Sequence, residues 1–197
     1  MAKLYFKYGA MGSSKSAQAL ITQFNYEELG MTVWLIKPSV DDRDGANIVK
    51  SRVGLSREAE VITPEDSIRA RYAATGGRDV IIADEAQFFM PGQIDELRDI
   101  VDELDVPVLC FGLRTDFLTH MFPGSMRLME LADSITEIKT VCACGSKATV
   151  NARVTPDGRI VTEGEQVFLG GNDAYVAMCH RCWKKKISEQ GAARMKK

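Results

Sequence analysis

Four short apolar runs divide the first part of the chain, and they constrain the fold more than any other feature. They read LYFKY (4–8), TVWLIKP (32–38), DVIIA (79–83) and VPVLCFGL (106–113). Strands that are apolar at nearly every position lie in parallel sheets buried on both faces. Helical spacing of apolar residues follows each run, and helices are expected over 15–29, 65–77, 91–104 and 124–134. This alternation predicts an α/β fold, a parallel sheet covered by helices. Shorter runs at 58–64 and 135–141 are expected to add strands.

Polar side chains follow three of these strands at the point where each strand ends. They lie in residues 9–16, at Asp84 and Glu85, and in the segment Arg114-Thr115-Asp116. In open α/β sheets, ligands bind outside the carboxyl ends of the strands. The sequence therefore predicts one site to which all three segments contribute.

Residues 9–16, GAMGSSKS, nearly match the phosphate-loop pattern G-x-x-x-x-G-K-[ST]. Backbone N–H groups would hold phosphate oxygens at the start of a helix. Lys15 would neutralise their charge, and the Ser16 hydroxyl would bind Mg²⁺. Ser14 stands where the second glycine belongs, and backbone strain there costs about 1–3 kcal/mol. The alternative is an ordinary turn before a helix. The residues expected to bind ATP phosphates are Gly9, Ala10, Met11, Gly12, Ser13, Ser14, Lys15 and Ser16.

The run DVIIADEAQ (79–87) supports a nucleotide site, because an apolar strand ending in a carboxylate is typical of a Walker B strand. Asp84 would bind Mg²⁺ directly or through water. Glu85 is placed to act as a general base, with a surface carboxylate or an ion-pair partner as the alternative. Phe88 and Phe89 follow, either as walls of a substrate pocket or as core residues. Water as the acceptor would make the chain an ATPase, and a substrate hydroxyl would make it a small-molecule kinase.

Net charge and composition limit the classes of partner that this protein could bind. The chain has 197 residues, a net charge of −2 and a pI of about 5.8. A nucleic-acid-binding surface is usually basic, and a helicase would also need a second motor domain. The start of the chain lacks the pattern of a signal peptide, and no run approaches the roughly 18 apolar residues of a membrane span. We expect a soluble cytoplasmic protein with no nucleic-acid or membrane partner.

Four of the five cysteines form two close pairs, Cys142-x-Cys144 and Cys179-x-x-Cys182. Four thiolates complete a tetrahedral zinc site with no open position, so the zinc would be structural. A zinc ribbon that binds nucleic acid is the alternative, which the acidic pI disfavours. The fifth cysteine, Cys110, lies in an apolar run and is expected in the core.

The pattern of the chain changes near residue 140. Residues 147–154 alternate between apolar and polar side chains, and TPDG (155–158) is a turn sequence. A β-hairpin followed by a loop is therefore expected between the two cysteine pairs. We place a nucleotide-binding domain at 1–140 and a zinc-stapled subdomain at 141–197.

Taken together, these motifs resemble the thymidine kinases of the zinc-containing, lasso-bearing type. The resemblance covers essentially the whole chain. It rests on GAMGSSKS, KPSVDDRDG with the later SRVG, DEAQFF, FGLRTDF followed by FPGS, the two cysteine pairs, and GGNDAY. It implies a P-loop (RecA-like) fold with a small zinc-binding β-hairpin and lasso. It also implies ATP-dependent phosphorylation of the thymidine 5′-hydroxyl to give dTMP, a homotetramer, and inhibition by dTTP. A P-loop ATPase linked to DNA metabolism is the alternative class.

The resemblance also assigns roles to single residues. Asp84, Glu85, Ala86 and Gln87 form the second segment at the ATP phosphates, with Glu85 as the general base. Lys15 and Arg43 would stabilise the transferred phosphoryl group. Asn151 and Ser14 depart from the common family pattern, and Asn151 receives no role. The residues assigned to substrate binding are Asp41, the thymine-pocket walls Phe88, Leu113 and Phe117, and the lasso residues Gln166, Val167, Phe168, Leu169, Gly170 and Tyr175.

Overall fold

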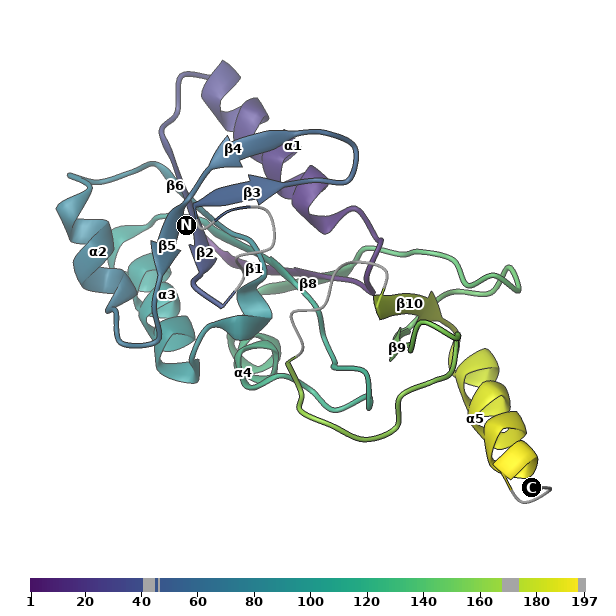
Figure 1. Cartoon of the computed structure of the whole chain (residues 1–197). Helices are drawn as coiled ribbons and strands as arrows, with labels where there is room; N and C mark the ends of the chain where they lie inside the picture. The colour runs from purple at the N-terminus through teal and green to yellow at the C-terminus, as the bar shows by residue number, and fades with distance from the viewer. Residues whose placement is uncertain (41–44, 46, 168–173, 195–197) are drawn as a thin grey trace.

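The structure is a computed structural model that describes residues 1–40, 45, 47–167 and 174–194. A six-stranded sheet forms its centre, in the order β5-β2-β6-β7-β1-β8, and every neighbouring pair of strands is parallel (Figure 1). The predicted α/β fold class is confirmed. The strands are β1 (Leu4–Tyr8), β2 (Val33–Pro38), β5 (Glu60–Ile62), β6 (Val80–Ala83), β7 (Val108–Gly112) and β8 (Ser134–Glu137).

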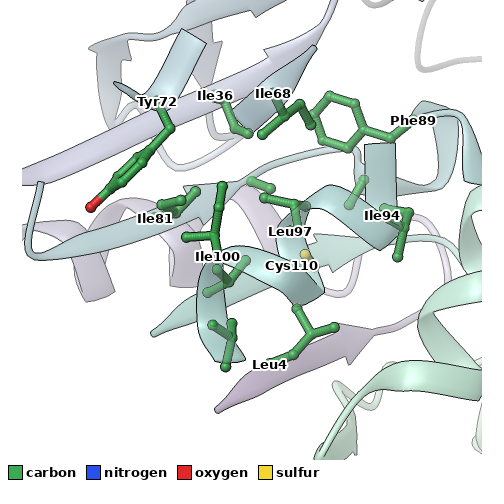
Figure 2. Close-up of a cluster of buried hydrophobic side chains, with 14 of the residues drawn as sticks. Leu4, Ile36, Ile68, Tyr72, Ile81, Phe89, Ile94, Leu97, Ile100 and Cys110 are labelled. Atoms are coloured by element: carbon green, nitrogen blue, oxygen red, sulfur yellow. The ribbon is translucent and has the colours of Figure 1, made fainter. Parts of the chain in front are cut away.

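Helices cover both faces of this sheet, as the apolar runs predict. On one face, α1 (Lys15–Glu28) contributes Ala19 and Leu20 to a buried cluster with Leu35 and Ile82. The other face carries α2 (Ile68–Ala74), α3 (Pro91–Leu104) and α4 (Pro123–Leu131). There Ile36 and Ile81, the strand neighbours of Leu35 and Ile82, join a second cluster (Figure 2). Successive strand residues point to opposite faces, so each strand needs apolar side chains at nearly every position.

Several element ends differ from the sequence-based expectation. Helix α2 begins at Ile68 rather than near residue 65, because the Thr63 N–H donates to the Asp66 carboxylate at 2.7 Å and the Ser67 hydroxyl caps the helix. Strand β8 ends at Glu137, because β1, its pairing partner, ends at Tyr8.

Some elements were not predicted from the sequence at all. Strands β3 (Ile48–Lys50) and β4 (Ser56–Glu58) form a separate antiparallel pair. A 3₁₀ turn, η1 (Ala86–Phe88), follows β6. Helix α5 (His180–Arg194) begins directly after Cys179 and extends away from the six-stranded sheet (Figure 1).

The cysteine-rich part of the chain forms a second, two-stranded sheet. The predicted turn is present, since the Gly158 N–H donates to the Thr155 carbonyl at 2.8 Å and a bridge joins Val154 to Ile160. The longer pairing, however, is between β9 (Val150–Arg153) and β10 (Tyr175–Met178), which are antiparallel. The sheet thus joins segments that lie on the two sides of the expected lasso. Within the described residues, no helix is both long and apolar enough to cross a membrane.

Candidate active site

The carboxyl ends of β1, β6 and β7 open into one cavity of about 230 Å³, as predicted from the three polar segments. The β3–β4 hairpin and the β9–β10 sheet contribute further walls. The described residues that line it are Met11, Gly12, Ser14, Lys15, Ser16, Ala17, Lys50, Ser51, Arg52, Val53, Glu85, Gln87, Phe88, Leu113, Asp116, Phe117, Phe122, Asn151, Gln166, Val167 and Tyr175.

The loop between β1 and α1, which the sequence predicts to bind phosphates, has an unusual backbone. Gly9 must be glycine, since a Cβ there would lie 2.4 Å from the Ile138 carbonyl oxygen and 2.4 Å from Ser13 Oγ. Gly12 has a φ of +75°, and Ser14 is left-handed with φ 63° and ψ 25°. Lys15 is buried, and its ammonium donates to the Ala10 carbonyl at 3.0 Å. The Lys15 ammonium therefore lies over the loop that would hold the phosphates.

Asp84 and Ser16 form a pair at the base of this loop. Asp84 is only 4% exposed, and burial, together with the charge of Glu85, raises its pKa from 3.8 to about 7. The Ser16 hydroxyl interacts with this carboxylate and opposes the rise in its pKa, yet the buried Asp84 Oδ1 has no hydrogen-bond partner in the described part of the chain. A buried carboxylate oxygen without a partner, beside a hydroxyl, is a donor set that fits Mg²⁺.

Glu85 is held in an unusual position directly after Asp84. Its backbone is left-handed, with φ 49° and ψ 37°, and such strain is frequent at functional sites. The Gln87 amide donates to Glu85 Oε2 at 2.5 Å, and its carbonyl Oε1 accepts from the Leu113 N–H at 2.9 Å. A Cβ at Gly112 would lie 2.6 Å from Gln87 Oε1. Gln87 thus fixes the carboxylate of Glu85 against the end of β7.

Aromatic side chains form the part of the cavity beyond Glu85. Phe117 is 1% exposed, and the Phe88 and Phe122 rings meet edge to face at 5.5 Å. Leu113 and Tyr175 add further walls. Phe89, in contrast, is a core residue in the same buried cluster as Ile68 and Ile94 (Figure 2). Of the two adjacent phenylalanines, only Phe88 faces the cavity.

Arg153 ties this aromatic region to the lasso, and the sequence analysis gave it no role. Its guanidinium lies 3.8 Å from the centre of the Phe117 ring. It donates to the Tyr175 hydroxyl at 3.1 Å and to the carbonyls of Glu165 and Gln166 at 3.0 and 3.3 Å. Its place on the polar face of the alternating segment 147–154 was the available signal.

Asp116 was predicted to contribute to the site as part of the segment 114–116, but neither Asp116 nor Asn151 was assigned a role of its own. Asp116 accepts from the N–H groups of Leu118 and His120, and from the Gln166 amide at 3.0 Å. Asn151 receives the Met11 N–H on its Oδ1 and donates from its Nδ2 to the Thr115 carbonyl, both at 2.8 Å. No sequence motif marked the bonds from Gln166 to Asp116, from Met11 to Asn151 or from Asn151 to Thr115, because each joins segments that are far apart in the chain.

The remaining predicted residues divide into three groups. Gly9, Ala10, Ser13, Asp84 and Ala86 are not among the residues that line the cavity, whereas Gln166 and Val167 line it. Asp41, Arg43, Phe168, Leu169 and Gly170 fall outside the described residues.

The four paired cysteines lie close together in space, although one pair precedes β9 in the chain and the other pair follows β10. Their sulfur atoms all lie within 4.8 Å of one another, and Cys144 and Cys179 are 3.7 Å apart. Sulfur ligands at ~2.3 Å in a zinc tetrahedron are about 3.8 Å apart. A backbone hydrogen bond from Ser146 leads the causes that lower the pKa of Cys144 to about 6, while contact with Cys144 raises that of Cys182 to about 12. The four sulfur atoms lie together, and the set fits a zinc ion.

Cys110 is not part of this cluster. It is completely buried in β7, and burial alone raises the pKa of its thiol. It is a core residue, as predicted.

Comparison with known proteins gives one consistent result. The family model described as thymidine kinase matches residues 2–183. A thymidine kinase of Ruegeria pomeroyi is 44% identical over 98% of each chain. One of Salmonella typhimurium is 43% identical over 96% of this chain and 94% of its own, and one of Vibrio vulnificus is 42% identical over 96% of this chain and all of its own. A match of this extent, on a chain whose strand ends form the cavity described above, shows that the protein belongs to the thymidine kinase family.

Proposed function

We propose that this enzyme transfers the γ-phosphoryl group of ATP to the 5′-hydroxyl of thymidine, giving dTMP and ADP. The observation that supports it most is the composition of one cavity. Lys15 and Ser16 of the phosphate loop, Glu85, and the aromatic side chains Phe88 and Phe117 all line the same space. A site for a phosphate donor and a flat apolar pocket for a base therefore share one enclosure.

The donor side of the proposal rests on the loop between β1 and α1. The loop N–H groups and the start of α1 would hold the phosphates. The Lys15 ammonium would move from the Ala10 carbonyl to the phosphate oxygens, which carry more negative charge. Mg²⁺, held by Ser16 and Asp84, would neutralise charge on the β- and γ-phosphates.

The acceptor side rests on Glu85. As the thymidine 5′-oxygen bonds to phosphorus and the bond from phosphorus to the ADP oxygen breaks, the Glu85 carboxylate would take the hydroxyl proton. The hydrogen bond from Gln87 keeps one oxygen of Glu85 engaged and orients the other. Arg43 and Asp41 complete the proposed set near the reacting phosphates.

The cysteine cluster has a structural part in the proposal. Structural zinc held by Cys142, Cys144, Cys179 and Cys182 would link the start of β9 to the end of β10. Those strands carry Arg153 and Tyr175, which contact each other, and Arg153 also donates to the segment leading into the lasso. The lasso residues 166–170 would then close over the base and exclude water from the reaction.

We also propose the remaining features that were expected from the sequence and from its resemblance to thymidine kinases. These are a nucleotide-binding domain at 1–140 and a zinc-stapled subdomain at 141–197, a homotetramer, inhibition by dTTP, and a cytoplasmic location without a nucleic-acid or membrane partner.

One experiment tests the function. Purified enzyme is titrated with thymidine at saturating ATP and Mg²⁺, and ADP and dTMP are both measured. Equal amounts of ADP and dTMP that depend on thymidine are expected. ATP hydrolysis that needs no thymidine and rises with added DNA would instead indicate an ATPase linked to DNA metabolism.

A further inference from the structure

The Asn151 side chain connects two segments that come from opposite parts of the chain. It lies on β9 and is 3% exposed. Its Oδ1 accepts the N–H of Met11, which with Gly12 forms the middle of the phosphate loop, called its crest below. Its Nδ2 donates to the carbonyl of Thr115, after β7. Both bonds measure 2.8 Å, and both partners are backbone groups. The amide therefore spans the gap between the end of β1 and the end of β7.

The bond to Met11 has a direct consequence for the phosphate loop. A backbone N–H that donates to Asn151 does not point at a phosphate, so Met11 contributes to the loop through its position. Gly12, Ser14 and Lys15 line the cavity beside this fixed crest. The loop crest also carries Gly12, whose φ is +75° and whose backbone, without a Cβ, has more conformational freedom than that of other residues.

The position of Asn151 is itself well determined. Ala177 on β10 pairs with it across the sheet, and the Thr149 N–H donates to the Met178 carbonyl at 2.9 Å. Cys179 follows Met178 directly, so the pairing continues into the cysteine cluster. The side chain that holds the loop is thus attached to a rigid element rather than to another loop.

We propose that Asn151 is a positioning residue, whose amide fixes the crest of the phosphate loop at the end of β7 and thereby sets the affinity for the nucleotide donor. This inference rests on the proposed function to the extent that the loop binds ATP. Asn151 need not touch either substrate. Its effect passes through the backbone of Met11.

The test compares Asn151→Leu with the matched control Val150→Ala. Leucine is similar in size but can make neither hydrogen bond, so the Met11 N–H and the Thr115 carbonyl lose their partner. Val150 is the adjacent buried residue of the same strand, and its truncation weakens the strand without touching those two groups. Binding of a non-hydrolysable ATP analogue with Mg²⁺, and of thymidine alone, is measured by calorimetry on zinc-replete protein.

The expected result is a split between the two ligands. Asn151→Leu weakens the analogue about tenfold, the scale of one hydrogen bond of ~1.4 kcal/mol. Thymidine affinity stays within about threefold, because Asp116 holds the loop that carries Phe117 through its own bonds to Leu118 and His120. Val150→Ala leaves both affinities within about twofold. Parent-like analogue binding by Asn151→Leu, or an equal loss in Val150→Ala, overturns the proposal.

Hydrogen exchange at the Met11 amide gives a readout that needs no ligand. Exchange is expected to speed up at least tenfold in Asn151→Leu. Asn151→Asp keeps an acceptor for the Met11 N–H and loses only the donor to Thr115, so its Met11 amide should remain slow. Fast exchange in folded Asn151→Asp contradicts the assignment, and this variant decides the matter if the leucine variant does not fold.

The outcomes also separate this inference from the proposed function. A parent enzyme that binds the analogue but forms no dTMP refutes thymidine phosphorylation, while the Asn151 comparison still stands. A parent enzyme that forms dTMP, with an unaffected leucine variant, refutes the role of Asn151 alone. Failure of the parent to bind the analogue refutes both.

Discussion

Ser14 offers the sharpest test of how the phosphate loop carries strain. The sequence pattern has glycine at this position, and the structure shows why, since Ser14 has φ 63° and ψ 25°. Its side chain is exposed and makes no capping hydrogen bond to α1. The hydroxyl therefore makes no capping hydrogen bond whose free energy would offset the strain of the left-handed backbone. Ser14→Gly should relieve that strain.

The size of the effect follows from two opposing contributions. A residue with a Cβ in the left-handed region costs about 1–2 kcal/mol relative to its preferred conformation. Glycine returns about 0.4–1 kcal/mol of this through the greater entropy of the unfolded chain. The net gain in the free energy of unfolding is about 0.5–1 kcal/mol. For a chain of this length, that corresponds to an increase in Tm of about 1–4 °C.

ATP affinity should change much less than stability. The left-handed turn is held by bonds within the protein, from the Gln18 N–H to the Ser14 carbonyl at 2.9 Å and from the Ser13 N–H to the Ala10 carbonyl at 3.2 Å. Because these bonds involve no ligand, the fold carries the strain whether or not ATP is bound. We therefore expect Ser14→Gly to change the Kd for ATP by less than about threefold.

Denaturant unfolding and calorimetric titration of ATP check the two parts separately. Ser14→Ala is the control, because it removes the hydroxyl and keeps the Cβ, and its stability should stay close to that of the parent. A gain of tenfold or more in ATP affinity in Ser14→Gly, about 1.4 kcal/mol, would show that the strain arises on binding and would refute this reasoning.

Four further predictions follow from the site. Glu85→Gln should keep ATP binding and lower kcat for thymidine about 10²–10⁴-fold, as expected for a lost general base, measured by dTMP formation. Cys179→Ser should reduce zinc below the one equivalent per chain expected for the parent, measured by elemental analysis, and should weaken thymidine binding. Arg153→Lys should raise the KM for thymidine about tenfold and leave that for ATP unchanged, because lysine lacks the flat group stacked on Phe117. In metal-free protein, Asp84→Asn should increase the free energy of unfolding at pH 8 by at most about 4 kcal/mol, and by little near pH 4, measured by denaturant unfolding in chelator.

The sign for Asp84 comes from proton linkage. Because burial raises the pKa of Asp84 to about 7, the folded protein binds a proton that the unfolded chain releases above pH ~4. Stability from this group is therefore present at low pH and is lost as the pH rises to about 7. An equal effect of Asp84→Asn at both pH values would contradict this account.

For the other variants, full turnover by Glu85→Gln, parent-like zinc in Cys179→Ser, or equal changes in both KM values for Arg153→Lys would each contradict the assigned role.

The main features of the fold could be predicted because the buried strands are apolar at nearly every position. That pattern depends on the chain alone, and it gave the parallel sheet, the covering helices and the three strand ends that meet at the cavity. The β3–β4 hairpin was missed because β4 is exposed and lacks an apolar signal. The pairing of β9 with β10 was missed because the turn at 155–158 favoured a local partner, whereas the cysteine cluster brings together segments about 35 residues apart.

Residues of the site could be predicted where a local motif specifies backbone geometry. Residues 9–16 and Asp84-Glu85 are such motifs. Asp116 was predicted as part of the polar segment 114–116, and it lines the cavity. Asn151 and Arg153 were missed because their partners are backbone groups or rings in distant segments, and a single sequence shows no such pairing. Phe88 and Phe89 illustrate the same limit, since only the turn after β6 decides which ring enters the cavity.

The positions of Asn151 and Arg153 suggest why a zinc-binding unit belongs to this site at all. The two residues are two apart on β9 and therefore point to the same face. One holds the phosphate loop and the other holds the aromatic pocket and the lasso segment. A shift of β9 by one residue against β10 would turn both side chains away. Zinc held by the four cysteines would fix that register, because it would join the chain before β9 to the chain after β10. Removal of zinc by a chelator should therefore weaken ATP and thymidine together in calorimetric titrations, whereas loss of thymidine binding alone would limit the cluster to the lasso.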